Sequence, residues 1–430
     1  MLKFPTHVQL EVTDTCNLRC YYCYHFNTKE MPKSNDLEHR QVIELVEKMV
    51  DAHVYSLVIT GGEPLARPDL IIEAVKIAKP AGMFVSINTN LLLLTEKILK
   101  DLKSSGVDSF LISCPASDPL MYRQITHCGD YKKWQSKLEL VIASGISCMV
   151  NMVVTPVNHK FIRSTAEDVS KIGVRRFSAT PASLNVEYPN NDDLLSRQQT
   201  NELLEDLRWC AEQLGLEVDI LEPMPKCFFP SWCWEKEYLF TKRVCQAGRL
   251  SVSISNIGDV RPCSHNPIVY GNLFKDSLED IWARMEIYRN SSIPIFCTSC
   301  PSVSSCNGAC RTNSLANTGT FNMPDRLISG HVNLPKIKKQ GESIKESSCV
   351  YFNGNLRWRC EGSCYSTTTK KSAGNLLVVN KELFDFIIWL NNHLPLTIKE
   401  LGDGVARESK KEDFLNVIEY LIKKEFIYLI

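Results

Sequence analysis

The first half of the chain alternates short apolar segments with helix-like segments, and this alternation constrains the fold more than any other feature. Helical spacing of apolar side chains follows each strand-like segment, with a long loop after the fourth; the segments are residues 8–12, 56–60, 83–87, 109–113, 148–154 and 176–179. Repeated strand–helix units with mostly apolar strands predict a parallel sheet covered by helices. Right-handed crossovers curl such a sheet towards a barrel, with ligands at the carboxyl ends of the strands. We therefore expect an α/β fold that begins with a partial (β/α)6 TIM-like barrel in residues 1–215.

Charge and hydropathy narrow the partners and the location. The 430 residues carry 49 Lys and Arg against 49 Asp and Glu, so nucleic acid and anionic membranes are not expected as partners. The sequence contains neither an apolar stretch long enough to span a membrane nor a signal peptide. A cytoplasmic protein is the prediction.

The 18 cysteines are clustered, and in a reducing compartment such clusters bind metal more often than they form disulfides. Isolated cysteines, in contrast, are expected to be buried apolar side chains; these are Cys114, Cys128, Cys148 and Cys210.

The first cluster follows the first predicted strand and reads Cys16-x3-Cys20-x2-Cys23. Three thiolates without a fourth nearby leave one iron of a [4Fe–4S] cube open to a second molecule. The alternative is a zinc site that includes His25.

The next strand ends in Gly61-Gly62-Glu63-Pro64. The two motifs, one strand apart and in this order, resemble the radical S-adenosylmethionine (SAM) superfamily over roughly residues 7–215. The resemblance implies that SAM chelates the open iron through its amino and carboxylate groups. It further implies that one-electron reduction cleaves SAM to methionine and a 5′-deoxyadenosyl radical, which abstracts hydrogen from the substrate.

The resemblance also assigns residues to the SAM site. The two glycines would let the backbone approach the methionyl group closely, and Glu63 would accept from its ammonium. Tyr22 would lie near the adenine, and Arg123 could pair with the SAM carboxylate. Further contacts are expected at the carboxyl ends of the third, fourth and fifth strands, at Ser86, Asn88, Asn90, Ser113, Asn151 and Val153. Ordinary loop capping is the alternative for the Ser and Asn residues.

A second pattern, Cys245-x12-Gly258-x4-Cys263 followed by Cys297-x2-Cys300-x5-Cys306-x3-Cys310, resembles the SPASM domain. That domain carries two auxiliary iron–sulfur clusters, expected to be [4Fe–4S] clusters that each need four ligands. A zinc-ribbon-like structural domain is the alternative.

By this analogy, Cys297, Cys300 and Cys306 bind the distal auxiliary cluster. Its fourth ligand is predicted to be Cys349, with Cys360 and Cys364 as rivals.

The proximal auxiliary cluster would take Cys245, Cys263 and Cys310. Either Cys227 or Cys233 completes it, or one iron stays open and could bind a substrate thiolate.

The remaining chain is divided by composition into a bridging region (216–244), the SPASM domain with a linker (245–348) and a C-terminal module (349–430). Three short strands and three helices in the last segment suggest a small winged-helix-like α+β module. An exposed strand edge there could add an extended leader peptide as a further strand.

Enzymes that resemble this arrangement mostly modify peptides or proteins. The leading hypothesis is therefore a radical SAM oxidoreductase that forms a thioether or carbon–carbon crosslink in a ribosomally made precursor peptide. A reductase, flavodoxin or ferredoxin would donate the electron.

Two alternatives remain. An anaerobic sulfatase maturase would oxidise a protein Cys or Ser, but such enzymes carry an aspartate base where this chain has Ser264-His265, so that His265 would have to take the proton. A non-catalytic iron–sulfur electron-transfer protein would need no SAM site.

Overall fold

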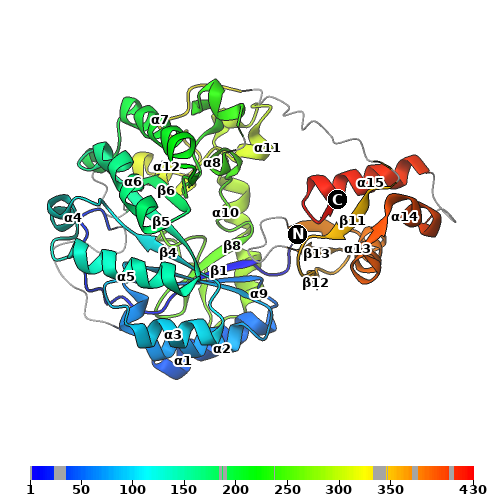
Figure 1. Ribbon diagram of the computed structural model, residues 1–430, viewed down its shortest axis with the longest axis horizontal. Coiled ribbons are helices and arrows are strands. Elements are labelled where there is room, and N and C mark those ends of the chain that lie inside the picture. Colours follow the sequence, from blue (N-terminus) through cyan, green and yellow to red (C-terminus); the bar gives the residue numbers. More distant parts are fainter. Residues whose placement is uncertain are drawn as a thin grey trace.

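The structure, a computed structural model, describes residues 2–23, 35–183, 186, 191–236, 238–332, 345, 347–369, 376–405 and 411–430. A large lobe holds the barrel and the cysteine-rich region, and a smaller C-terminal lobe lies beside it (Figure 1). In the described part of the chain, no helix combines the length and apolar character that crossing a bilayer requires.

A ten-stranded sheet forms the centre of the large lobe, in the order β10-β9-β8-β1-β2-β3-β4-β5-β6-β7. Strands β1 to β7 pair in parallel, which confirms the partial TIM-like barrel. Their bounds are β1 (His7–Glu11), β2 (Ser56–Thr60), β3 (Phe84–Thr89), β4 (Ser109–Ser113), β5 (Ser147–Val154), β6 (Arg176–Pro181) and β7 (Glu217–Asp219).

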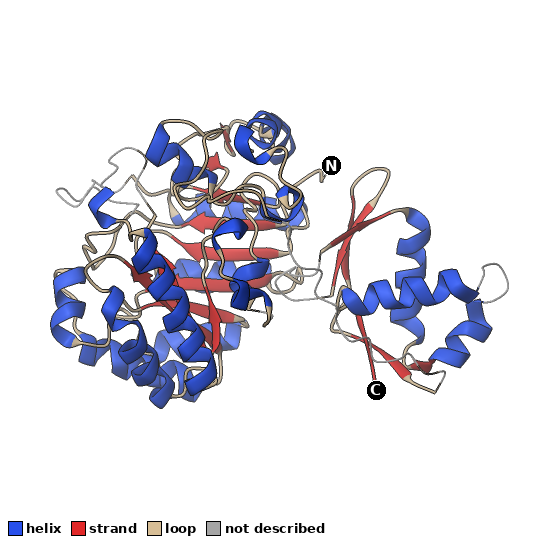
Figure 2. Cartoon of the chain, turned by 90° about the horizontal axis from the view of Figure 1, so that it is seen from above, coloured by secondary structure: helices blue, strands red, loops and turns tan. Residues whose placement is uncertain are grey.

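The helices that connect these strands pack around the sheet (Figure 2). Their bounds are α1 (His39–Asp51), α2 (Pro68–Ala78), α3 (Glu96–Ser105), α4 (Pro119–Thr126), α5 (Tyr131–Ser144), α6 (Ile162–Ile172) and α7 (Arg197–Leu214). Helix α4 lies where the sequence analysis expects only a loop.

The cysteine-rich region continues the same sheet. Strand β8 (Ser251–Ile254) pairs in parallel with β1, and β9 (Asp259–Arg261) and β10 (Gly271–Asn272) follow as antiparallel strands. Barrel and cysteine-rich strands share one hydrophobic core, so the sheet crosses the boundaries expected at residues 215 and 245. The rest of this region is short helices: η4 (Lys226–Phe228), η5 (Ser231–Trp234), α8 (Leu239–Lys242), α9 (Leu278–Arg284), α10 (Glu286–Ser291), η6 (Ile295–Cys297), α11 (Val303–Cys306) and α12 (Arg311–Thr318).

The C-terminal module has a hydrophobic core of its own and two three-stranded antiparallel sheets, β15-β11-β16 and β12-β13-β14. Its strands are β11 (Cys349–Phe352), β12 (Arg357–Cys360), β13 (Tyr365–Thr368), β14 (Leu377–Val379), β15 (Leu396–Thr397) and β16 (Ile427–Leu429). Its helices are α13 (Lys381–His393), α14 (Ile398–Val405) and α15 (Lys411–Lys423). The winged-helix assignment stays a prediction.

The module docks at the amino ends of the first barrel strands (Figure 2). The Arg359 guanidinium donates to the carbonyl of Phe4 at 2.8 Å, just before β1, and to that of Ala52 at 3.1 Å, at the end of α1. The Tyr55 hydroxyl, which directly precedes β2, donates to the carbonyl of Ser366 at 2.9 Å. The module therefore leaves the carboxyl ends of the strands to the functional site.

Candidate active site and iron–sulfur centres

The three cysteines of the first cluster lie on the loop that follows β1, at the carboxyl end of the sheet. The Arg19 and Tyr21 amides donate to the carbonyls of Thr126 and Ile125, both at 3.2 Å, and hold this loop against the end of α4. The sequence therefore places the thiols where ligands bind in a barrel of this kind.

The thiols of this loop are close enough to affect one another. Burial above all, opposed by the Leu18 N–H that donates to its sulfur at 3.4 Å and reinforced by Glu63, Cys23 and Cys128, raises the pKa of Cys16 to about 12. Burial, followed by Cys23 and Cys16, likewise raises the pKa of Cys20. Three thiols that oppose one another's ionisation suit a cationic iron centre, which removes this repulsion.

The two glycines at the end of β2 make room for the β1 loop. A Cβ on Gly61, whose φ is +138°, would lie 2.4 Å from the Thr13 carbonyl oxygen, and a Cβ on Gly62 would lie 2.4 Å from that of Thr15. The Gly62 and Glu63 amides donate to the same two carbonyls at 2.7 and 2.8 Å. The sequence analysis attributes both glycines to the approach of SAM, whereas here the space of their missing side chains belongs to the neighbouring backbone.

Glu63 is buried, and both of its carboxylate oxygens are bonded. Oε1 accepts from the Thr89 hydroxyl at 2.7 Å and the Leu65 amide at 3.0 Å, and Oε2 accepts from the Asn90 amide at 2.8 Å. Burial raises the pKa of Glu63 to about 7, although these donors favour the charged form. Glu63 thus ties the motif, including Pro64 in the turn η1 (Pro64–Ala66), to the end of β3. Its contact with the SAM ammonium stays a prediction.

Ser86 and Asn88 lie on one side of the sheet, because they are two positions apart in β3, and Asn90 directly follows this strand. The side-chain nitrogen of Asn90, Nδ2, donates to Asn17 Oδ1 at 2.9 Å and lies 3.9 Å from the Cys16 sulfur. The end of β3 therefore adjoins the first cysteine cluster.

The other predicted SAM contacts have different surroundings. The Asn151 side-chain oxygen accepts from two hydroxyls of β6, Ser178 at 2.8 Å and Thr180 at 2.9 Å. Burial, together with Cys20 and Cys23, places the pKa of Tyr22 well above its ordinary value.

Two of these residues end their strands, and one lies on a helix. Ser113 is the last residue of β4, and Val153 lies near the end of β5. Arg123 is exposed in the last turn of α4. The SAM contacts of all these residues stay predictions.

The isolated cysteines divide into two kinds. Cys114, Cys148 and Cys210 are buried, as expected, but Cys128 is exposed, so the prediction is wrong for that residue. The Cys128 thiol donates to the Asn17 carbonyl at 3.3 Å, beside the first cysteine cluster. His25, the zinc alternative, lies outside the described residues.

A second group of thiols combines Cys245, which precedes β8, with Cys263 after β9 and Cys310 at the start of α12. Burial, with a smaller contribution from Cys245, raises the pKa of Cys263 to about 11. Burial, Glu222 and both other thiols raise the pKa of Cys310 well above its ordinary value. The three predicted proximal ligands therefore lie together.

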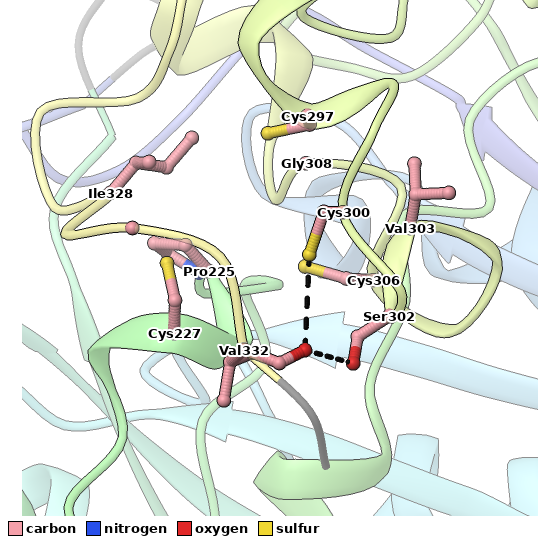
Figure 3. Close-up of a pocket in the computed structure, with 11 residues that line it drawn as sticks. Pro225, Cys227, Cys297, Cys300, Ser302, Val303, Cys306, Gly308, Ile328 and Val332 are labelled. Carbon is pink, nitrogen blue, oxygen red and sulfur yellow. Dashed lines mark hydrogen bonds between the residues drawn. The ribbon is translucent and has the colours of Figure 1, made fainter.

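A third group lines one cavity in the cysteine-rich region (Figure 3). Cys297, Cys300 and Cys306 are the predicted distal ligands, and Cys227 from η4 lines the same cavity. Cys349 lies instead in β11 of the C-terminal module, paired with Thr397. Chain order alone could not show that the bridging region returns to this cavity.

Comparison with known proteins agrees with this geometry. Residues 10–169 match the radical SAM superfamily, and residues 245–311 match the SPASM iron–sulfur cluster-binding domain. The chain is a radical SAM enzyme with an SPASM domain. It thus uses a [4Fe–4S] cluster and SAM, and its SPASM domain binds auxiliary iron–sulfur clusters.

Two curated relatives are similar to about three quarters of this chain. The AdoMet-dependent heme synthase of Methanosarcina barkeri is 23% identical over 342 residues, which span 75% of this chain and 95% of the relative. The PqqA peptide cyclase of Gluconobacter oxydans is 26% identical over 350 residues, 76% of this chain and 90% of the relative. The structure of Streptococcus suis SuiB bound to precursor peptide SuiA shares the fold, with a TM-score of 0.61, 19% identity and 76% of each chain covered.

Orphaned donors at the auxiliary centres fit iron–sulfur clusters. Among the described residues, the Tyr288 hydroxyl and Arg311 Nη2 are buried without a hydrogen-bond partner. Cys245, Cys263 and Cys310 all raise the pKa of Tyr288, after burial, so its ring lies beside the proximal thiols. Cluster sulfides accept hydrogen bonds and would satisfy such donors.

Glu222 is a candidate site residue that the sequence analysis missed. It lies in the loop after β7 and accepts from Ser183 at 2.8 Å and from the Asn313 amide. Burial raises its pKa to about 7, and it contacts Cys310. An acidic residue just beyond a short strand was the available signal.

His265, the candidate base of the sulfatase-maturase alternative, is half-buried with its Nδ1 3.4 Å from the Ser264 hydroxyl.

Proposed function

We propose that this radical SAM enzyme matures a ribosomally made precursor peptide by forming a thioether or carbon–carbon crosslink. Three quarters of the chain are similar to a peptide cyclase, and the fold is that of an enzyme seen with its precursor peptide. A similar share of the chain, 75%, is also similar to a heme synthase, so we do not base the choice of a peptide on that similarity alone. In this proposal, the C-terminal module selects the peptide substrate.

The C-terminal module offers a strand edge for an extended leader. Strand β14 ends the order β12-β13-β14, with no further strand paired to it among the described residues, whereas the side chains of Arg357 and Arg359 on β12, at the opposite edge, contact the barrel. Val378 in the middle of β14 is 53% exposed. An extended peptide adds to such an edge through its main chain, with side-chain pockets giving specificity. This edge is the observation on which the peptide assignment rests.

The proximal group favours a thioether product. Its three thiols leave one iron of a cube open, because Cys227 lines the distal cavity and Cys233 is buried beside Glu205 and Arg208 of α7. An open iron can hold a substrate thiolate. Aliphatic and aromatic crosslinks need no such position.

When bound, SAM and its cluster would supply a 5′-deoxyadenosyl radical for hydrogen abstraction, and the auxiliary clusters would accept the electron left on the product. The chain holds SAM at the carboxyl ends of β1 to β6 and shields it from water. We propose that a reductase, flavodoxin or ferredoxin supplies the electron in the cytoplasm, where cysteines stay reduced.

The test is an anaerobic reaction with SAM, a reductant and the peptide encoded by a short neighbouring reading frame. We expect 5′-deoxyadenosine and a peptide that has lost two hydrogens per crosslink. Fewer alkylatable thiols after the reaction identify a thioether. Omitting the leader should abolish the change. Formation of 5′-deoxyadenosine with no change in any leader-bearing peptide would contradict the assignment.

A peptide that gains an aldehyde, with no crosslink, would instead favour the sulfatase-maturase alternative. The matched variant His265→Ala should leave crosslinking unchanged and should lower aldehyde formation.

A further inference from the structure

Four cysteines line the cavity of the cysteine-rich region, whereas the SPASM motif supplies only three of them. Cys297 belongs to η6, Cys300 to the following turn and Cys306 to the end of α11, whereas Cys227 comes from η4, seventy positions before Cys297. Figure 3 shows Cys227 across the cavity from the other three. All four thiols line this one cavity.

The backbone around the cavity is arranged for sulfur. The Lys226 amide lies 3.4 Å from the Cys306 sulfur, and the Ser329 amide lies 3.5 Å from the Cys227 sulfur. The Ser329 hydroxyl also donates to the Cys227 carbonyl at 2.7 Å, which fixes the turn that carries this thiol. Amide donors of this kind stabilise thiolates in iron–sulfur sites and tune their potential.

The remaining lining of the cavity is mostly small or apolar, and two buried cations lie nearby. The other lining residues are Pro225, Ser302, Val303, Gly308, Ile328, Gly330 and Val332. Lys226 and Arg311 are both buried near this cavity: Lys226 precedes Cys227 in the chain, and the guanidinium carbon of Arg311 lies 3.5 Å from where a Cβ on Gly308 would be. A cluster with four thiolate ligands carries net negative charge, so two buried cations are a suitable environment.

The rival cysteines are placed elsewhere. All 18 cysteines lie in the described part of the chain. Cys349 exchanges backbone hydrogen bonds with Ile430 at 3.0 Å in both directions, inside the C-terminal module. Cys360 and Cys364 belong to the same module, which has its own core and docks at the amino ends of the barrel strands.

We propose that Cys227 is the fourth ligand of the distal auxiliary cluster, together with Cys297, Cys300 and Cys306. The ligand comes from the bridging region before the SPASM motif and takes the place of a cysteine after it. The C-terminal module therefore contributes no ligand and is free to bind a partner.

The test counts iron in the full-length protein after anaerobic reconstitution. The starting variant replaces Cys16, Cys20 and Cys23 by Ala, so that only the auxiliary clusters remain, with about eight irons per chain. Adding Cys227→Ala should remove up to about half of that iron or leave a three-iron cluster with its own EPR signal. Adding Cys349→Ala, the matched control, should change neither the iron count nor the Mössbauer spectrum.

Two results would overturn the proposal: full iron with an unchanged spectrum in the Cys227→Ala variant, or iron loss caused by Cys349→Ala. If Cys227→Ala loses both clusters through misfolding, Cys227→Ser decides. A serine oxygen can ligate iron, so the proposal then requires a retained cluster with one altered iron site in the Mössbauer spectrum. An unchanged all-sulfur spectrum would refute it. None of these readouts depends on SAM or a peptide, so the outcome is independent of the proposed function.

Discussion

Replacing Arg359 by Ala should release the C-terminal module from the barrel. Its guanidinium is buried and donates to the carbonyls of Phe4, Ala52 and Pro5 at 2.8 to 3.3 Å. It also pairs with the buried carboxylate of Glu361 at 2.7 Å. Truncation would leave that carboxylate with two other donors and no cation. Removing one partner of a buried ion pair costs about 3–5 kcal/mol, more than the pair's net contribution to stability.

Amide hydrogen exchange of β13 and α13 measures this loss directly. A cost of about 3–5 kcal/mol should accelerate exchange by about two to three and a half orders of magnitude, since about 1.4 kcal/mol is tenfold. The double variant Arg359→Met with Glu361→Gln should recover at least about 1 kcal/mol, because the buried charge is gone. Arg284→Ala is the control, since Arg284 forms an exposed ion pair with Asp276 worth under about 1 kcal/mol. Equal exchange in the Arg359→Ala and Arg284→Ala variants would refute the reasoning.

Three further predictions concern the cofactor sites. Glu63→Gln should cost about 1–3 kcal/mol of stability in urea unfolding and weaken SAM binding in equilibrium dialysis, because one buried amide then faces the new NH2 group; unchanged binding would contradict the role of the carboxylate. Gly62→Ala should prevent loading of the first cluster, measured as lost iron, because its Cβ would meet backbone at 2.4 Å; Gly402→Ala in α14, with open space around its Cβ, should keep full iron. Removing the clusters should destabilise the SPASM region in calorimetry. The Tyr288→Phe variant should reduce the difference in unfolding free energy between cluster-loaded and cluster-free protein by about 1–3 kcal/mol, because it deletes a hydroxyl that is buried without a partner when the cluster is absent. An unchanged difference in unfolding free energy would argue against a contact between Tyr288 and the cluster.

The sequence predicted the barrel strands well because each of β1 to β6 has at least two buried apolar side chains at alternate positions. The predicted segments at residues 56–60 and 109–113 coincide with β2 and β4. Helix α4 was missed although Asp118 caps it and Pro119 is its first residue, since eight residues give too little periodicity to read. Strands β7 to β10 have two to four residues, below the length at which alternation is informative.

Buried polar residues and contacts between segments far apart in the sequence could not be predicted. Strand β13 reads Tyr365-Ser-Thr-Thr, and its Ser366 is buried because the barrel covers it, which local pattern cannot reveal. The sequence grouped cysteines only where their spacing is short. It offered Cys227 as one of two rival fourth ligands of the proximal cluster, with an open iron as the third alternative. Only the folded path of the chain brings Cys227 to the Cys297 cavity.

The production of 5′-deoxyadenosine by the anaerobically reconstituted protein tests the central claim most directly. The account predicts SAM cleavage by the unaltered chain and by Cys128→Ala, whose thiol lies beside the first cluster but is not a proposed ligand. Cys20→Ala should cleave none. Cleavage by the Cys20→Ala variant, or none by an unaltered chain with its full complement of iron, would contradict an iron site held open by three thiolates.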